Sequence, residues 1–137
     1  VGAPEGERHS LPVSMVADLI RQSGWEVYDL GSDLPADSFA VAARNTIDLA
    51  AVCISVTSEG SLSKAVDAIT EVRNVVHPSV QIFVGGLAVK SAEQAETLGA
   101  DGWAANAGDL VAVLNELPSR TPIDNTDEYF NDTRSAG

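Results

Sequence analysis

A glutamate and a histidine two positions apart, Glu7 and His9, are the side chains of this sequence best suited to hold a ligand. They follow a short apolar opening, residues 1–3, and precede a helical pattern that begins at Val13. A carboxylate and an imidazole in a loop between a strand and a helix lie at the mouth of a sheet, where α/β proteins bind their ligands. The loop from Glu7 to Pro12 is therefore the first part of the predicted site.

Two later turns are expected on the same edge of the sheet. Ser55 and Thr57 stand where one nearly unbroken apolar run ends, and Gly85 and Gly86 end another. Runs of this kind are typical of strands that are covered on both faces. Because the carboxyl ends of parallel strands share one edge, the three loops together are predicted to form one ligand site.

Strand-like and helix-like segments alternate along residues 1–117. In the helical segments apolar residues recur at helical spacing, as Val13, Val16, Ala17 and Ile20 do. The predicted strands are residues 1–3, 25–31, 49–55, 80–84 and 103–105, and the predicted helices are residues 13–24, 35–45, 61–76, 91–98 and 109–117. This alternation predicts an α/β, flavodoxin-like (Rossmann-like) fold, with a five-stranded parallel sheet in the order 2-1-3-4-5 and helices on both faces.

The two ends of the sequence differ from the rest. Residues 1–3 read as the end of a strand, so we expect the opening of the sheet, and a further domain, upstream of this sequence. Residues 118–137 are polar and acidic with no sustained period, which predicts a disordered tail. Residues 1–117 then form a single domain, which is long enough to bury a proper core.

The composition argues against several classes of function. The formal net charge of −12 disfavours nucleic acid binding by this domain, because phosphate contacts need clustered Lys and Arg. No apolar run approaches the roughly 20 residues that span a bilayer, and no signal-peptide pattern is present, so we expect no membrane association and a cytoplasmic location. The lone Cys53 lies in an apolar run and is predicted to be a core residue.

The motifs do not match three kinds of site that are common in this fold. A phosphoacceptor receiver domain needs an Asp at the end of the third strand, where this sequence has Ser55, and an acidic pair after the first, where Glu7 stands alone. A dinucleotide site needs G-x-G-x-x-G after the first strand, and this motif is absent. A flavodoxin-type phosphate loop would be rich in Ser and Thr at the same place.

The combined pattern resembles the cobalamin (vitamin B12)-binding domains of the methionine synthase, methylmalonyl-CoA mutase and light-sensing regulator type. That family carries D-x-H-x-x-G, then S-x-L, then G-G. The corresponding motifs of this sequence, in the same order, are Glu7-x-His9-x-x-Pro12, Ser55-x-Thr57 and Gly85-Gly86. The resemblance covers residues 1–117 and extends to the segment that follows the first helix.

The resemblance implies a role for each matching residue. His9 would be the lower axial ligand of cobalt, in place of the dimethylbenzimidazole base (base-off/His-on), because neutral imidazole suits that metal. Glu7 would accept the other ring N–H and fix the tautomer. Ser55 would hydrogen-bond the displaced base, and Gly85 and Gly86 would let the backbone approach the nucleotide tail.

Three positions depart from the family motif: Glu7 replaces Asp, Pro12 replaces Gly and Thr57 replaces Leu. Proline stiffens the loop and removes an N–H, and threonine puts a hydroxyl where the family has an apolar wall. Pro12 and Thr57 are the best support for one alternative, a degenerate domain that serves protein–protein contacts or binds another tetrapyrrole.

The main hypothesis from the sequence is a cobalamin-binding sensory or regulatory domain, light-responsive through adenosylcobalamin and not itself an enzyme. A second alternative is the corrinoid carrier domain of a methyltransferase or mutase, with adenosylcobalamin or methylcobalamin as cofactor. The expected partners are the corrinoid ligand and an upstream domain, a second copy of the chain or another protein. The preference for a sensor depends on analogy and on no particular residue.

Overall fold

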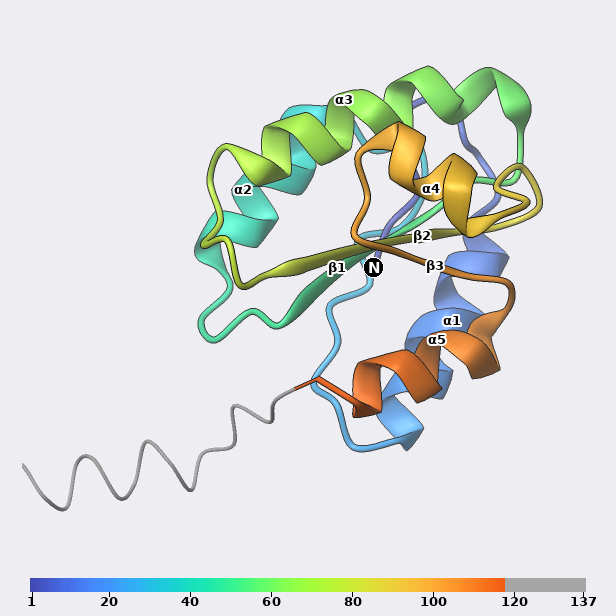
Figure 1. Cartoon of the computed structure of the whole chain (residues 1–137). Coiled ribbons are helices and arrows are strands. Elements are labelled where there is room, and N and C mark those ends of the chain that lie inside the picture. Colours follow the sequence, from blue (N-terminus) through green and yellow to red (C-terminus); the bar gives the residue numbers. More distant parts are fainter. Residues whose placement is uncertain (118–137) are drawn as a thin grey trace, which may run out of the picture.

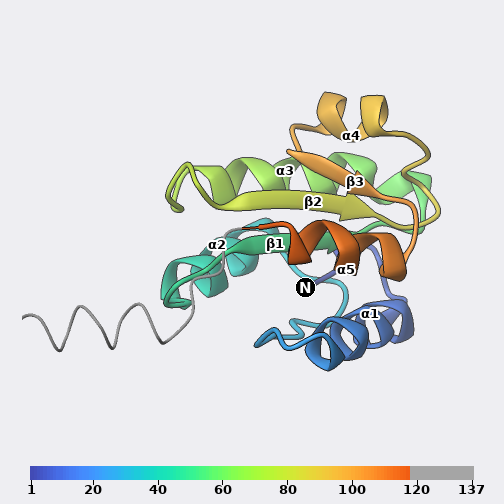
Figure 2. The same ribbon diagram turned by 60° about the horizontal axis from the view of Figure 1, so that its bottom comes forward.

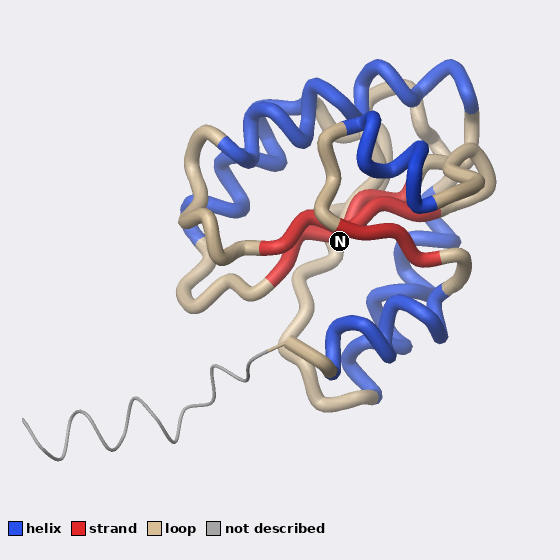
Figure 3. The backbone as a smooth tube through the Cα atoms, in the orientation of Figure 1, coloured by secondary structure: helices blue, strands red, loops and turns tan. Residues whose placement is uncertain are grey.

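The computed structural model describes residues 1–117, and the predicted tail, residues 118–137, lies outside the described residues. Within the described part, three parallel strands form one sheet in the order β1-β2-β3 (Figures 1 and 3). The strands are β1 (Ala51–Ser55), β2 (Gln81–Gly85) and β3 (Gly102–Ala104). The helices are α1 (Ser10–Gln22), α2 (Ala36–Asn45), α3 (Leu62–Arg73), α4 (Ala92–Leu98) and α5 (Ala107–Asn115), with a 3-10 turn η1 (Glu59–Ser61) before α3.

Helices cover both faces of the sheet, as the buried apolar strands predicted. Helices α2, α3 and α4 lie on one face, and α1 and α5 lie on the other (Figures 1 and 2). Alternate residues of β1 face opposite layers. Val52 and Ile54 belong to the core beneath α2 and α3, whereas Cys53 belongs to the core beneath α1 and α5. Cys53 is buried, as predicted, and the α/β class with a parallel sheet is confirmed.

The five-stranded sheet is not observed, because three strands form rather than five. The predicted first strand is reduced to two isolated bridges, Gly2 with Ile54 and Pro4 with Leu34. Proline has no N–H to donate and the chain turns immediately after it, so this segment cannot build a longer ladder. The predicted second strand, residues 25–31, is irregular in the structure. It still alternates, since Trp25 and Val27 pack on the core whereas Tyr28 is exposed.

Helix α1 begins three residues earlier than the periodicity predicted, which makes His9 its N-cap residue. Pro12 is then the third residue of the helix. This position tolerates proline because the first four N–H groups of a helix have no partner within the helix. The departure from glycine at Pro12 is therefore compatible with an ordered helix directly after the histidine.

Helix α2 begins at Ala36, one residue later than the sequence predicts, with Pro35 as its N-cap residue, and Asp33 does not cap it. Asp33 instead adopts a left-handed backbone conformation, with φ of 54°, and turns toward the loop that carries Glu7. In the part of the chain that the structure describes, no helix is long and apolar enough to cross a bilayer.

Candidate functional site

Glu7 is a buried carboxylate, only 1 % exposed, between the first loop and the end of β1. Its Oε1 atom lies 2.6 Å from Nδ1 of His9 and accepts a hydrogen bond from the Thr57 hydroxyl at 2.5 Å. Its Oε2 atom accepts the backbone N–H groups of Thr57 and Ser58, each at 2.9 Å. The carboxylate thus joins the loop after residue 4 to the loop after β1, and both of its oxygens are used.

The surroundings of Glu7 hold it in the charged form. Burial raises the pKa of its carboxyl, but hydrogen bonds from Thr57, His9 and Ser58 lower it by more, so that the net result is a pKa of about 2. An ionised carboxylate accepts hydrogen bonds only, and it can therefore fix the proton of the imidazole on Nδ1.

Glu7 is expected to make folding stability depend on pH in acid. A carboxyl whose pKa falls from 4.5 to about 2 on folding contributes stability in full above about pH 4.5 and loses it as the pH drops toward 2. We expect about 2 kcal/mol of this contribution to disappear between about pH 6 and about pH 3. Urea unfolding at both pH values measures it. Glu7→Gln is the reference because it lacks the titrating group, and an equal loss in both proteins would assign the effect to other carboxyls.

His9 is held through one of its two ring nitrogens. Its side chain is 67 % exposed, and Nδ1 is occupied by the contact with Glu7 and lies 3.2 Å from the Thr57 hydroxyl. No hydrogen bond or ion pair connects Nε2 to residues 1–117. Among these residues there is also no group of three or more His, Cys, Asp or Glu that could hold a metal ion.

An apolar cavity of about 380 Å³ opens at the carboxyl ends of the strands. Five of the residues predicted for the site line it: Pro12, Ser55, Thr57, Gly85 and Gly86. The rest of the lining is mainly apolar and comes from Val1, from α1, from the three strands, from the loops after β2 and β3 and from α5. Thr57 connects the cavity to the buried pair, because it lines the cavity and also donates to Glu7. The structure thus brings all seven predicted residues to one edge of the sheet.

Contacts within the chain require glycine at positions 85 and 86, whether or not a ligand is bound. A Cβ atom at Gly85 would lie 2.8 Å from the carbonyl oxygen of Ala104. A Cβ atom at Gly86 would collide with the carbonyl of Val56 and lie 2.8 Å from its nitrogen, and φ is +98° there. The two glycines therefore allow β2 to pass close to its neighbours at the mouth of the cavity.

Replacing Gly86 with alanine is expected to destabilise the fold by at least about 2 kcal/mol, since both the collision with Val56 and the left-handed conformation oppose a side chain. Urea unfolding measures the change. Gly60→Ala is the matched control because a Cβ there meets nothing within 4 Å. Equal stability of the two variants would contradict the expected collision.

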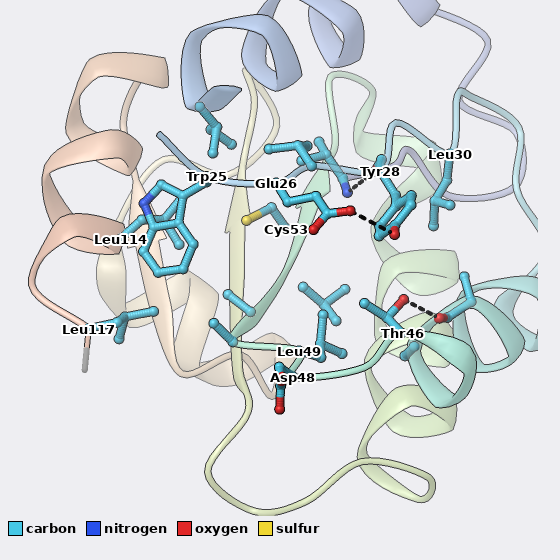
Figure 4. A pocket seen from close by; sticks show the side chains of 18 of the residues that line it. Trp25, Glu26, Tyr28, Leu30, Thr46, Asp48, Leu49, Cys53, Leu114 and Leu117 are labelled. Carbon is cyan, nitrogen blue, oxygen red and sulfur yellow. Dashed lines mark hydrogen bonds between the residues drawn. The ribbon is translucent and has the colours of Figure 1, made fainter. Parts of the chain in front are cut away.

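A larger cavity, of about 890 Å³, lies at the opposite edge of the sheet, where the strands begin. Figure 4 shows Trp25 and Leu114 on one side of it and Tyr28 and Leu30 on the other, with Cys53 between them. None of the seven predicted site residues lines it. Size alone therefore does not locate the candidate site, which lies at the edge where the carboxylate, imidazole and glycines meet.

Sequence reasoning missed two features of the site. It treated Thr57 as a change in an apolar wall, whereas the hydroxyl is a hydrogen-bond donor to Glu7. It also missed Asp33, whose carboxylate accepts the N–H of Gly6 at 2.8 Å. Neither contact follows from local spacing, because each joins residues that are far apart in the sequence.

The family model of the B12 binding domain matches residues 1–112. The chain belongs to this family. The resemblance inferred from the three motifs is confirmed, and with it cobalamin as the cofactor that the family binds.

Similar curated proteins include dimethylamine corrinoid proteins of Methanosarcina species. The chain is 32 % identical to dimethylamine corrinoid protein 3 of Methanosarcina acetivorans over 117 residues, which are 85 % of this chain and 54 % of that protein. It is 31 % identical to dimethylamine corrinoid protein 1 of Methanosarcina mazei over 120 residues, 85 % of this chain and 53 % of that protein. The chain thus spans about half the length of the curated relatives that it matches.

Two solved structures share the fold of this B12-binding domain. The monomethylamine corrinoid protein of Methanosarcina barkeri matches with a TM-score of 0.73 at 23 % identity, over 82 % of this chain and 53 % of that one. The methanol:cobalamin methyltransferase complex MtaBC of the same organism matches with a TM-score of 0.72 at 19 % identity, over 84 % of this chain and 45 % of that one. At these identities the likeness concerns the fold alone.

Proposed function

We propose that this B12-binding domain is a corrinoid carrier of a methyl-transfer system, with His9 as the lower axial ligand of cobalt. The observation that carries the proposal is the Glu7–His9 pair, which Thr57 connects to the apolar cavity, with Nδ1 held by the carboxylate and the imidazole largely exposed.

The chain's residues divide the binding task between them. Glu7 holds a proton on Nδ1 of His9 and so leaves the lone pair of Nε2 for the metal. The cavity beside Ser55, Gly85 and Gly86 would receive the displaced base and the nucleotide tail away from water. The Ser55 hydroxyl makes no hydrogen bond within residues 1–117, so it is available to the base. When bound, the corrinoid supplies a cobalt ion that carries the methyl group.

The departures at Pro12 and Thr57 are compatible with this function. Pro12 occupies a helix position that needs no N–H, and both residues line the cavity without closing it. The Thr57 hydroxyl meets the carboxylate of Glu7, which is one methylene longer than the family's Asp. The two changes thus complement each other, and this argues against the degenerate domain that no longer binds cobalamin.

The sequence leaves the carrier as an alternative, and the relatives favour it over the light-responsive sensor. They are corrinoid proteins for methylamines and a methanol:cobalamin methyltransferase complex. A carrier does not catalyse methyl transfer alone, so the partner we propose is a separate methyltransferase that docks over the exposed edge at His9.

Hydroxocobalamin and adenosylcobalamin added to the purified chain, with free ligand removed by gel filtration, test this function. We expect both to be retained in the dark, hydroxocobalamin with the absorbance of histidine ligation, and green light to leave the oligomeric state unchanged. A light-driven change of oligomeric state would favour the sensor. A folded protein that retains no corrinoid would overturn cobalamin binding and favour the degenerate domain.

A further inference from the structure

We infer that Asp33 is a positioning residue of the site, which fixes the backbone around Glu7 and so sets the geometry of the Glu7–His9 pair. This inference deepens the proposed function and depends on it for its meaning in corrinoid binding. Its structural basis is independent of any ligand. The Asp33 carboxylate accepts the N–H of Gly6 at 2.8 Å, and the Asp33 N–H donates to the carbonyl of Glu7 at 2.6 Å.

These contacts hold the Glu5–Gly6 and Glu7–Arg8 peptide groups in place. The chain turns at this point, since the Glu7 N–H donates to the Pro4 carbonyl at 2.9 Å and Gly6 has φ of +86°, as the third residue of a type II turn requires. Asp33 holds the peptide group that precedes this one in the chain, through the Gly6 N–H, and the peptide group that follows it, through the Glu7 carbonyl. Three consecutive peptide groups around Glu7 are therefore hydrogen-bonded: one to the Asp33 side chain, one to the Asp33 backbone N–H and one to the Pro4 carbonyl.

The backbone of Asp33 is itself in a conformation that few residues adopt. Its φ of 54° lies in the left-handed region, which costs energy for residues other than glycine but is tolerated by Asp and Asn. The hydrogen bond from Leu34 to the carbonyl of Ala3, at 3.1 Å, holds the next residue against the same loop. Such a conformation persists where the surrounding contacts determine it, and these contacts all converge on the loop of Glu7.

The position of the Glu7 backbone matters because its side chain must satisfy two sets of partners at once. Oε2 faces the N–H groups of Thr57 and Ser58, while Oε1 faces His9. A carboxylate that is held on both sides tolerates little movement of its Cα atom before one set is lost. Without Asp33 we therefore expect the loop to move and the imidazole to lose its fixed proton.

The test compares Asp33→Gly with Asp33→Asn. Glycine permits the left-handed backbone but removes the acceptor, whereas asparagine permits the backbone and keeps an oxygen acceptor. The readouts are amide hydrogen exchange at Thr57 and Ser58 and the tautomer of the His9 ring, both by NMR in the chain without corrinoid. For Asp33→Gly we expect roughly tenfold faster exchange at both amides and a mixture of ring tautomers. For Asp33→Asn we expect exchange within about threefold of the original and an unchanged tautomer.

Asp48→Gly is the matched control because Asp48 is the other non-glycine residue with positive φ, at 55°, in the part of the chain that the structure describes. It lines the cavity at the opposite edge of the sheet. A general loss of stability would affect exchange in both glycine variants, whereas a positioning role affects Thr57, Ser58 and His9 in Asp33→Gly alone. Unchanged exchange and an unchanged tautomer in Asp33→Gly would overturn the inference.

Two further measurements keep the inference separate from folding and from the proposed function. If Asp33→Gly does not fold, the exchange of the Gly6 amide in the original chain decides, and exchange as fast as that of an unprotected loop amide overturns the inference. If the original chain binds no hydroxocobalamin, the carrier proposal fails, yet the apo measurements still decide the role of Asp33. If it binds, we expect roughly tenfold weaker retention in Asp33→Gly and rescue in Asp33→Asn.

Discussion

His9→Ala is expected to abolish the absorbance of histidine-ligated corrinoid and to weaken hydroxocobalamin binding by about 100-fold or more. The side chain is 67 % exposed and its contacts are to Glu7 and Thr57, so the fold should survive its removal. Equilibrium dialysis with recorded spectra measures both effects. Addition of free imidazole to His9→Gly should restore the spectrum, since the cavity left by the side chain can admit the missing ligand.

The control for this prediction is the only other histidine of the sequence, His77. It follows α3, and its Nδ1 atom is 2.8 Å from the Ser79 hydroxyl, remote from the site edge of the sheet. His77→Ala should therefore leave corrinoid binding unchanged. A spectrum that is lost in His77→Ala and retained in His9→Ala would show that the wrong axial ligand has been chosen.

The elements that local pattern determines were predicted well from the sequence. Helical periodicity and buried apolar runs located α1 to α5 and β1 to β3 to within a few residues. The first two predicted strands do not form as regular strands. Residues 1–4 make several backbone hydrogen bonds with residues 28–34 and with β1, but only two isolated bridges result. Alternating side chains can therefore pack as in a strand without a ladder, as Trp25 and Val27 do.

The sequence predicted which residues would lie together in the candidate site, but not how their side chains contact one another. Topology brought three loops to one edge, and the family motif named the residues on them. The sequence could not show which hydroxyl donates to Glu7, because that hydrogen bond joins two separate loops. Asp33 illustrates the same limit. A local rule favours Asp before Leu-Pro as a helix cap, yet the hydrogen bonds to Gly6 and Glu7 determine its conformation.

Glu7→Gln is expected to cost about 2–3 kcal/mol of stability and to weaken corrinoid binding by roughly 10- to 100-fold. A glutamine has one acceptor oxygen where the carboxylate has two. If that oxygen faces the N–H groups of Thr57 and Ser58, the amide N–H₂ opposes Nδ1–H of His9. If it faces His9, two buried backbone donors lose their acceptor. Urea unfolding and equilibrium dialysis measure the two effects, and a fully stable Glu7→Gln with original affinity would contradict the role of the charge.

The complementarity of Glu7 and Thr57 is tested by a double-mutant cycle with Glu7→Asp and Thr57→Val. Valine removes only the hydroxyl that donates to Oε1, so in the original background we expect it to cost about 1–2 kcal/mol of stability. In the Glu7→Asp background the shorter carboxylate withdraws from that hydroxyl, and the same change should cost little. A coupling energy of about 1 kcal/mol in urea unfolding would show that the longer acid and the threonine act as a pair. Additive effects would mean that the two departures from the family motif are independent, and Thr57 would then matter to Glu7 only through its backbone N–H.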